Sequence, residues 1–253
     1  MLDITHGLPK ESIPRHYIEF GLFDSRRFKL NLHQRVADTP SEKEITTSIP
    51  YMQGIVDMSN AIGNRIYENR EITYTFYRFG VKQDTARDFQ TTIENLLMGQ
   101  FDTRLDDSYE PDFHYMGKCQ SVVVTDDYQR NRLRIEVTFD LYPFKIDNHM
   151  ESADLFDSFN FDLDAFQNGL AFQIGQTAQT IHLYNTSQLT LSPWIETQAT
   201  GITFTMEQTS HSLRLGRYRY PNIRLKPGLN ALVLQRASAG TTRVSFDWRK
   251  ERI

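Results

Sequence analysis

The stretch that decides the fold runs from residue 70 to residue 146. Residues 70–79 read REITYTFYRF, residues 83–99 read QDTARDFQTTIENLLMG, and residues 121–142 read SVVVTDDYQRNRLRIEVTFDLY. Aromatic and β-branched residues dominate 72–79 and Gly80 closes the run, which predicts a strand. The next segment predicts a helix that ends at Gly99 and buries one face, because its apolar residues recur at steps of three and four: Ala86, Phe89, Ile93, Leu96 and Leu97.

After residues 100–120, which we interpret as a polar connection, the sequence period changes to two. Residues 121–125 lead into a turn at 126–131, and residues 132–142 then alternate strictly. One face of this second strand holds Leu133, Ile135, Val137, Phe139 and Leu141, and the other holds charged residues and Thr138. Such alternation predicts a strand with one side on a core and one side in water. This succession of a strand, a helix and a hairpin predicts a mainly β fold, namely a β-sandwich with one packed α-helix.

Composition sets wider bounds. The 253 residues suffice for one large or two ordinary domains. The single cysteine, Cys119, excludes an internal disulfide framework; this fits a reducing compartment, although one buried thiol would look the same. A net charge of −4 gives no indication of nucleic-acid binding, and the chain has no run of about eighteen apolar residues that would predict a membrane span. Residues 1–16 lack the apolar centre of a secretory signal.

Upstream of the central stretch, residues 17–23 and 28–32 predict two short strands around a turn. Residues 36–64 then keep neither the helical nor the strand period, although they contain large apolar residues. We expect this segment to be an arm that packs on a neighbouring subunit, because a disordered tail would be poorer in such residues. The candidate interface residues are Ile49, Tyr51, Met52, Ile55 and Met58.

Downstream, the polar residues 147–152 predict a domain boundary, with domains at 1–148 and 149–253. Residues 151–166 alternate acids with aromatics, which fits either a strand pair with its acids in water or a surface for a basic partner. From Gly169 onward no helix is expected. Short apolar or β-branched runs separated by turn residues predict a second antiparallel sandwich, with strands at 171–174, 180–183, 189–191, 202–206, 212–215, 231–234 and 243–248.

The order of several motifs resembles the distal tail (Dit) protein family of long-tailed siphophages. In the first half these are Ser25-x-x-Phe28-x-Leu30-x-Leu32, Ile49-Pro-Tyr-x-x-Gly54-x-x-Asp57, the strand from Asn69, Leu96-Leu97 and Val137-Thr-Phe-x-x-Tyr-Pro143. In the second half Tyr184-Asn185, Ser192-Pro193, Leu225-x-x-Gly228-Leu-Asn230 and Val244-Ser-Phe-Asp-Trp248 are similar to the galectin-like sandwich of that family. Residues 1–16 lie outside the match.

The resemblance implies a structural hub in the virion, at the distal end of a phage tail and assembled in the host cytoplasm. It implies a homo-hexameric ring with a tail-tube-like first domain and a galectin-like second domain. The expected partners are the tail tube protein, the tape measure protein, the tail-associated tip protein and the baseplate or receptor-binding proteins. DNA would pass through the lumen of the ring without specific binding.

Other functions find less support in the sequence. A carbohydrate-binding module is the alternative, with His182, Asn185, Trp194 and Glu196 as the nearest candidates, although no Arg lies between Gly169 and Leu213. Both tryptophans, Trp194 and Trp248, are expected in the core or at an interface. Residues 212–226 hold five basic residues and two tyrosines without an acid, which fits single-stranded nucleic acid or an acidic neighbour.

No catalytic residue, cofactor or metal is expected, so the chain is interpreted as a protein that is not an enzyme. The histidines are scattered singly, without the pairing that zinc sites use, and one cysteine cannot complete a ligand set: His6, His16, His33, His114, His149, His182 and His211. The chain contains no G-x-S-x-G, P-loop or Rossmann glycine pattern.

Overall fold

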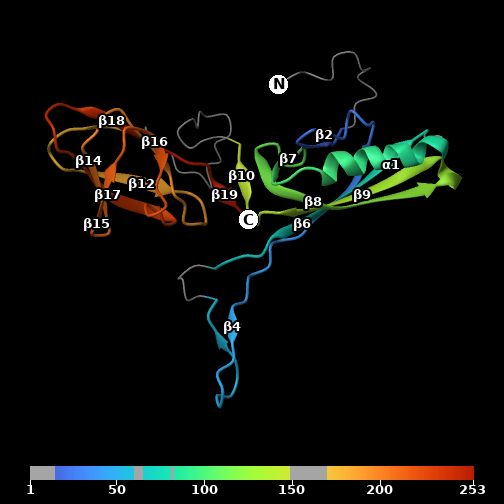
Figure 1. The fold of residues 1–253 in the computed structure, drawn as a ribbon, viewed down its shortest axis with the longest axis horizontal. Coiled ribbons are helices and arrows are strands. Elements are labelled where there is room, and N and C mark those ends of the chain that lie inside the picture. The colour runs from blue at the N-terminus through green and yellow to red at the C-terminus, as the bar shows by residue number, and fades with distance from the viewer. Residues whose placement is uncertain (1–14, 60–64, 81–82, 149–169) are drawn as a thin grey trace. The chain divides into compact units, whose positions relative to one another are not determined.

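The computed structural model describes residues 15–59, 65–80, 83–148 and 170–253 (Figure 1). The chain divides into two compact units, 1–145 together with Ile253, and 146–252. The acidic and aromatic run at 151–166 lies outside the described residues, as does most of the segment 147–152. The boundary between residues 148 and 149 therefore stays a prediction.

The first unit is built on one antiparallel sheet with the strand order β2-β1-β7-β8-β9-β6-β3. The helix α1 (Gln83–Met98) follows β6 and lies over the sheet (Figure 1). A short two-stranded ladder, β4 with β5, stands apart from the sheet. The strands are β1 (Ile18–Phe20), β2 (Phe23–Asp24), β3 (Asn31–Ala37), β4 (Thr46–Thr47), β5 (Val56–Asp57), β6 (Arg70–Phe79), β7 (Thr103–Asp107), β8 (Phe113–Asp127) and β9 (Arg132–Leu141), with β10 (Lys145–Asp147) at the division between the units.

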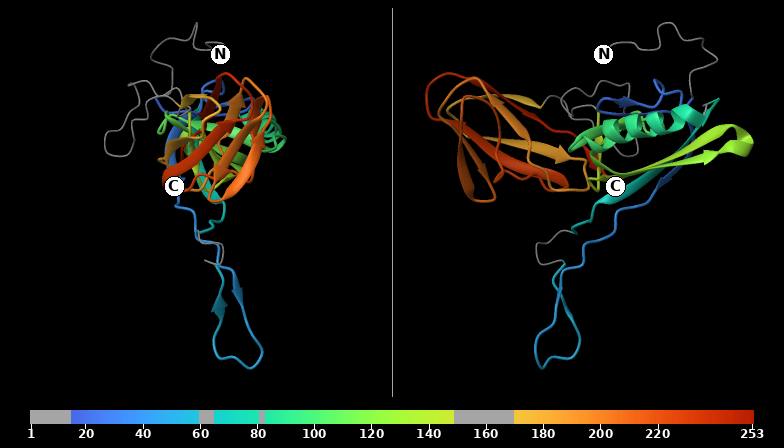
Figure 2. Two further views of the ribbon diagram at one scale, coloured as in Figure 1. Left: turned by 90° about the vertical axis from the view of Figure 1, so that its left-hand side faces the viewer. Right: turned by 45° about the vertical axis from the view of Figure 1, so that its right-hand side comes forward.

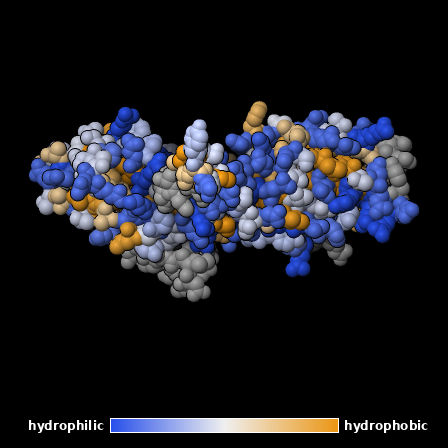
Figure 3. Space-filling view, turned by 90° about the horizontal axis from the view of Figure 1, so that it is seen from below, coloured by the Kyte–Doolittle hydropathy of each residue, from blue (hydrophilic) through white to orange (hydrophobic). Residues whose placement is uncertain are grey.

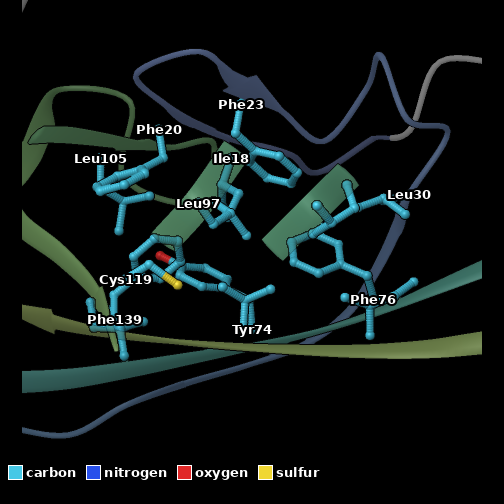
Figure 4. Close-up of a cluster of buried hydrophobic side chains, with 14 of the residues drawn as sticks. Ile18, Phe20, Phe23, Leu30, Tyr74, Phe76, Leu97, Leu105, Cys119 and Phe139 are labelled. Atoms are coloured by element: carbon cyan, nitrogen blue, oxygen red, sulfur yellow. The ribbon is translucent and has the colours of Figure 1, made fainter. Parts of the chain in front are cut away.

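The core of the first unit lies between two layers. One layer is formed by the long strands of the sheet, from which Tyr74 and Phe139 project, and the other by α1 together with β1 and β2 at the edge of the same sheet (Figure 4). The rings of Phe20 and Phe139 meet across the core with centroids 5.0 Å apart. The predicted apolar face of β9 is buried here, as is that of α1 except for Leu96, which is partly exposed, so the mainly β fold with one packed helix is confirmed.

Three local expectations in this unit were wrong. Residues 17–23 are not one strand but the hairpin β1–β2, because Gly21 turns the chain with a φ of 53°. The run 28–32 becomes a strand only at Asn31, because residues 25–30 close a turn in which the N–H of Leu30 donates to the carbonyl of Ser25. Residues 100–120 hold β7 and the first half of β8 rather than a loop.

The second unit is a sandwich of two four-stranded antiparallel sheets, in the orders β11-β18-β13-β16 and β12-β17-β14-β15. Ile195 and Phe246 from the first sheet and Phe204 and Leu234 from the second share one buried core. The strands are β11 (Ala171–Ile174), β12 (Gln179–Asn185), β13 (Trp194–Thr197), β14 (Ile202–Met206), β15 (Thr209–Leu213), β16 (Gly216–Arg219), β17 (Gly228–Arg236) and β18 (Thr242–Asp247), with β19 (Glu251–Arg252) near the end.

This sandwich confirms the predicted class of the second half, and the described residues 170–253 contain no helix. Residues 189–191 do not form a strand, because only Leu191 bridges to Leu225. The sequence interpretation missed β13 and β16, whose outward residues include Trp194 and Arg217 and so give no continuous apolar signal.

Candidate assembly surface

The segment after β3 leaves the first unit as a long arm and returns to β6 (Figures 1 and 2). Sparse backbone hydrogen bonds join its two legs: the N–H of Lys43 donates to the carbonyl of Ile66 at 2.8 Å, and that of Met58 donates to Ile45 at 2.8 Å. The ladder β4–β5 has only two residues on each side. Strands this short explain why the sequence of the arm shows no period.

The tip of the arm is a tight turn from Ile49 to Met52. The N–H of Met52 donates to the carbonyl of Ile49 at 3.1 Å, with Pro50 and Tyr51 between them. Pro50 suits the second position of a type II turn, and Tyr51 takes the third with a φ of 67°, where glycine is the usual residue. Tyr51 at the tip therefore has an unfavourable backbone conformation, and its aromatic side chain is fully exposed to solvent.

All five predicted interface residues lie on this arm, and all are exposed. The exposed fraction of the side chains ranges from 46% for Met58 to complete exposure for Tyr51, and the five are Ile49, Tyr51, Met52, Ile55 and Met58. Figure 3 views the face from which the arm projects, where apolar residues form small groups among hydrophilic ones. The role of the five arm residues as a subunit interface stays a prediction.

A buried polar network fixes the base of both legs of the arm. Arg35, on the outgoing strand β3, donates to the carboxylates of Asp107 and Glu110, at 2.6 Å in each case. Arg70, at the start of the returning strand β6, is 7% exposed and donates to the hydroxyl of Tyr115 at 3.4 Å. Because these partners sit on or beside β7 and β8, the network ties the arm to the rigid sheet.

The same network changes the acidity of its members. Burial lowers the pKa of the Arg35 guanidinium, but Tyr74 and Asp107 outweigh burial and raise that pKa above its usual value. Burial and the hydrogen bond to Glu110 raise the pKa of Tyr115 to about 12. Burial opposes ionisation of Glu110, yet hydrogen bonds from Lys145 and Tyr115 lower its pKa below the usual value. The carboxylate of Glu110 is thus held ionised beside Lys145 and Arg35.

A second exposed apolar group in this unit was missed from the sequence. We call it the helix-end patch: Leu22 in the β1–β2 turn, Met98 at the end of α1, and Phe101 before β7. Leu22 was hidden inside the apolar run 17–23, which reads as one strand. The signal that could have found it is Gly21, because a glycine inside a strand pattern often marks a bend.

In the second unit the predicted sugar-site residues do not come together. His182 lies on β12 in one sheet, and Asn185 is buried there with its side chain donating to the carbonyls of Leu189 and Leu225. Trp194 and Glu196 lie on β13 in the other sheet. Trp248 is buried in the core, whereas Trp194 is 41% exposed, so for Trp194 the expectation of an interface position stays a prediction.

The structure instead brings arginines beside Trp194. Across the β13–β16 ladder, Trp194 pairs with Arg219 and Glu196 pairs with Arg217. The Arg217 guanidinium lies 5.4 Å from the centroid of the Trp194 ring and donates to Asp247 at 2.9 Å. Among the described residues, the carboxylate of Glu196 has no hydrogen-bond or ion-pair partner.

The basic segment 212–226 does not form one basic face. Arg217 is paired with Asp247, and Lys226 donates to Glu207 at 2.6 Å. The hydroxyl of Tyr220 accepts from the backbone N–H of Arg214. Within the described ranges, no group of three or more His, Cys, Asp or Glu side chains is placed to hold a metal ion. No helix in those ranges has both the length and the apolar character needed to cross a membrane.

No family model and no curated protein sequence matches this chain. Solved structures do match. The crystal structure of the Dit protein of phage SPP1, a hub of the adsorption apparatus in phages that infect Gram-positive bacteria, aligns with a TM-score of 0.59 and 14% identity over 92% of this chain and 98% of that one.

Two structures of the phage p2 baseplate in its activated conformation, with strontium and with calcium, align at 10% identity and a TM-score of 0.39. They cover 92% of this chain and 98% and 97% of theirs. The argument for the fold rests on the SPP1 match, which spans both units. The protein therefore has the fold of the Dit protein of phage SPP1, a mainly β fold with one packed helix.

Proposed function

We propose that this protein is a structural hub of a phage tail tip or baseplate. In this role it forms a hexameric ring at the distal end of the tail and joins the tail tube to the adsorption apparatus. The fold likeness to a phage hub protein across nearly the whole of both chains supports the class of function. The role is not catalytic.

The observation that carries the proposal is the arm. Fully burying a large apolar side chain contributes about 1.5–3 kcal/mol, which the arm forgoes in a free monomer. A contact from the arm of one subunit to another face of the next is heterologous, and such contacts close into rings or continue as filaments. The resemblance to Dit proteins favours the closed ring of six.

The ring would stand between several partners. These are the tail tube and tape measure proteins on one side, and the tail-associated tip protein and the baseplate or receptor-binding proteins on the other. DNA would cross the lumen without specific binding, which requires a lumen free of strong basic patches. The net charge of −4 is compatible with such a lumen.

The test replaces Ile49, Tyr51 and Met52 together by Ser. These side chains are exposed in the monomer, so the variant is expected to fold and to sediment as a monomer. The matched control replaces three exposed apolar residues of the second unit, Tyr184, Leu215 and Leu229, by Ser, and is expected to keep the ring. A triple arm variant that still sediments as a hexamer would show that the arm does not form the interface between subunits.

The face around Trp194 favours a second candidate function, carbohydrate binding. An exposed aromatic ring can stack on the apolar face of a pyranose, while the Glu196 carboxylate can accept hydrogen bonds from sugar hydroxyls and Arg219 can donate them. Glycan-array binding by the full chain, lost in Trp194→Ala and kept in Tyr184→Ala on the other sheet, would support it. A wild-type protein that binds no glycan would exclude it.

A further inference from the structure

The helix-end patch is a small apolar surface with large exposed side chains. Phe101 is 91% exposed, Leu22 is 74% exposed and Met98 is half-exposed. The N–H of Leu22 donates to the side chain of Gln100, which Met98 and Phe101 flank in the sequence, so the three residues belong to one region. Single exposed apolar residues are common on protein surfaces, but three in one region are a candidate contact site.

The polar side chain at the patch, Gln100, finds its hydrogen-bond partners within the fold. The side-chain amide of Gln100 donates to the carbonyls of Phe20, at 3.2 Å, and Leu96, at 2.5 Å. Its oxygen accepts from the N–H of Leu22 at 3.3 Å. A Cβ built on Gly21 would lie 1.6 Å from that oxygen, so only glycine allows this approach. Covering the patch therefore breaks none of these hydrogen bonds.

The patch and the arm lie at opposite edges of the first unit. In the strand order β2-β1-β7-β8-β9-β6-β3, the arm connects β3 and β6 at one edge, and Leu22 joins β1 and β2 at the other. The arm also points away from the side that carries β2 and α1 (Figures 1 and 2). A heterologous ring needs its donating and receiving surfaces on different faces of the subunit.

We propose that the helix-end patch receives the arm tip of the neighbouring subunit. The occupant is a second copy of this chain, with Tyr51 and Met52 packing against Phe101 and Leu22. This inference rests on the proposed function, and it names the receiving surface of the ring. Burial of the exposed aromatic at the tip would offset the unfavourable backbone conformation of Tyr51.

Two other exposed apolar residues of the sheet, Phe79 and Val123, are poorer receivers because each lies beside an ion pair. Phe79 pairs across the ladder with Arg132, which forms an ion pair with Asp127 at 2.9 Å. Val123 pairs with Glu136, which accepts from Arg134 at 2.7 Å. Apolar contact at either point would remove water from an ion pair, which is costly.

Cysteine cross-linking tests the inference on the full chain. Tyr51→Cys and Phe101→Cys are made as separate single variants, mixed, and treated with a short bifunctional maleimide. The native Cys119 gives little background, because it is buried and burial raises the pKa of its thiol to about 12. The mixture is expected to give covalent dimers, whereas each single variant treated alone should give no covalent product. A chain that carries both Tyr51→Cys and Phe101→Cys should give a ladder of covalent oligomers.

Tyr51→Cys mixed with Val123→Cys is the matched control and is expected to give no dimer. Met52→Cys with Leu22→Cys provides a second pair if the first fails to assemble. If sedimentation detects a ring but neither pair gives a cross-linked dimer, this inference alone is overturned. The same holds if Tyr51→Cys is cross-linked to Val123→Cys. A wild-type chain that never assembles would overturn the proposed function together with it.

Discussion

At the scale of single residues, Glu110 is the centre of the network that holds the arm. It accepts from Lys145 and from Arg35, at 2.6 Å in each case, and also from the hydroxyl of Tyr115. Its side chain is 22% exposed, so solvent screens these interactions less than at the surface. Removing the carboxylate leaves the half-buried Lys145 without its anion and Arg35 with Asp107 alone, which costs more than loss of an exposed pair.

We expect Glu110→Gln to lower the free energy of unfolding by about 1–3 kcal/mol at neutral pH. The matched control is Glu136→Gln, which removes the more exposed pair with Arg134 and should cost about 0.2–1 kcal/mol. Urea unfolding of the three proteins measures both changes. Equal small losses in the two variants would show that the network adds no more than a surface ion pair.

The pH dependence of this effect has a defined sign. The unfolded glutamate titrates near about 4.3, and the folded pKa of Glu110 is lower. The stabilisation is therefore complete above about pH 4.3 and is lost as the pH falls through the folded pKa. The difference between wild type and Glu110→Gln should shrink in acid. A difference that grows as the pH falls would contradict the lowered pKa.

The sequence could not predict this network, although it predicted the apolar core beside it. Asp107 ends the pentapeptide TRLDD, which has one apolar residue and reads as a polar connection. The carboxylate is nevertheless buried, because Tyr74 and Arg35 donate to it from strands more than thirty and seventy positions earlier in the chain. Such partners become visible only when the strands are paired.

At the scale of elements, periodicity predicted the long segments and failed for the short ones. α1 and β9 present one buried face over three turns or ten residues, so their patterns are unambiguous. β13 and β16 have four residues each, and their structure depends on neighbouring strands. The arm was predicted because its apolar residues fit no local element, but its hairpin form was not predicted, because its ladder is so short.

The arm provides the prediction at this scale. Its few backbone hydrogen bonds and exposed side chains predict fast amide hydrogen exchange over residues 43–58 in the monomer. Assembly should slow this exchange, whereas β15 (Thr209–Leu213), an edge strand of the second unit, should change little. Hydrogen-exchange mass spectrometry of monomer and ring compares them. If amide hydrogen exchange in the arm is unchanged on assembly, the arm does not lie in the subunit interface.

At the scale of the whole molecule, the chain is expected to separate near residues 147–152. Contacts divide it between Lys145 and Ile146, close to the polar segment that the sequence predicts as the boundary. Proteases cut first where few contacts hold the backbone, so limited proteolysis should yield fragments of roughly 148 and 105 residues. First cuts within residues 132–142 would contradict both the boundary and the rigidity of β9.

The mass of the wild-type protein in solution tests the central claim most directly. Sedimentation with negative-stain imaging, with and without its tail partners, is expected to give closed rings of about six times the 29.6 kDa chain mass at sufficient concentration. A protein that remains monomeric at every concentration, alone and with those partners, would contradict the assignment as a tail hub.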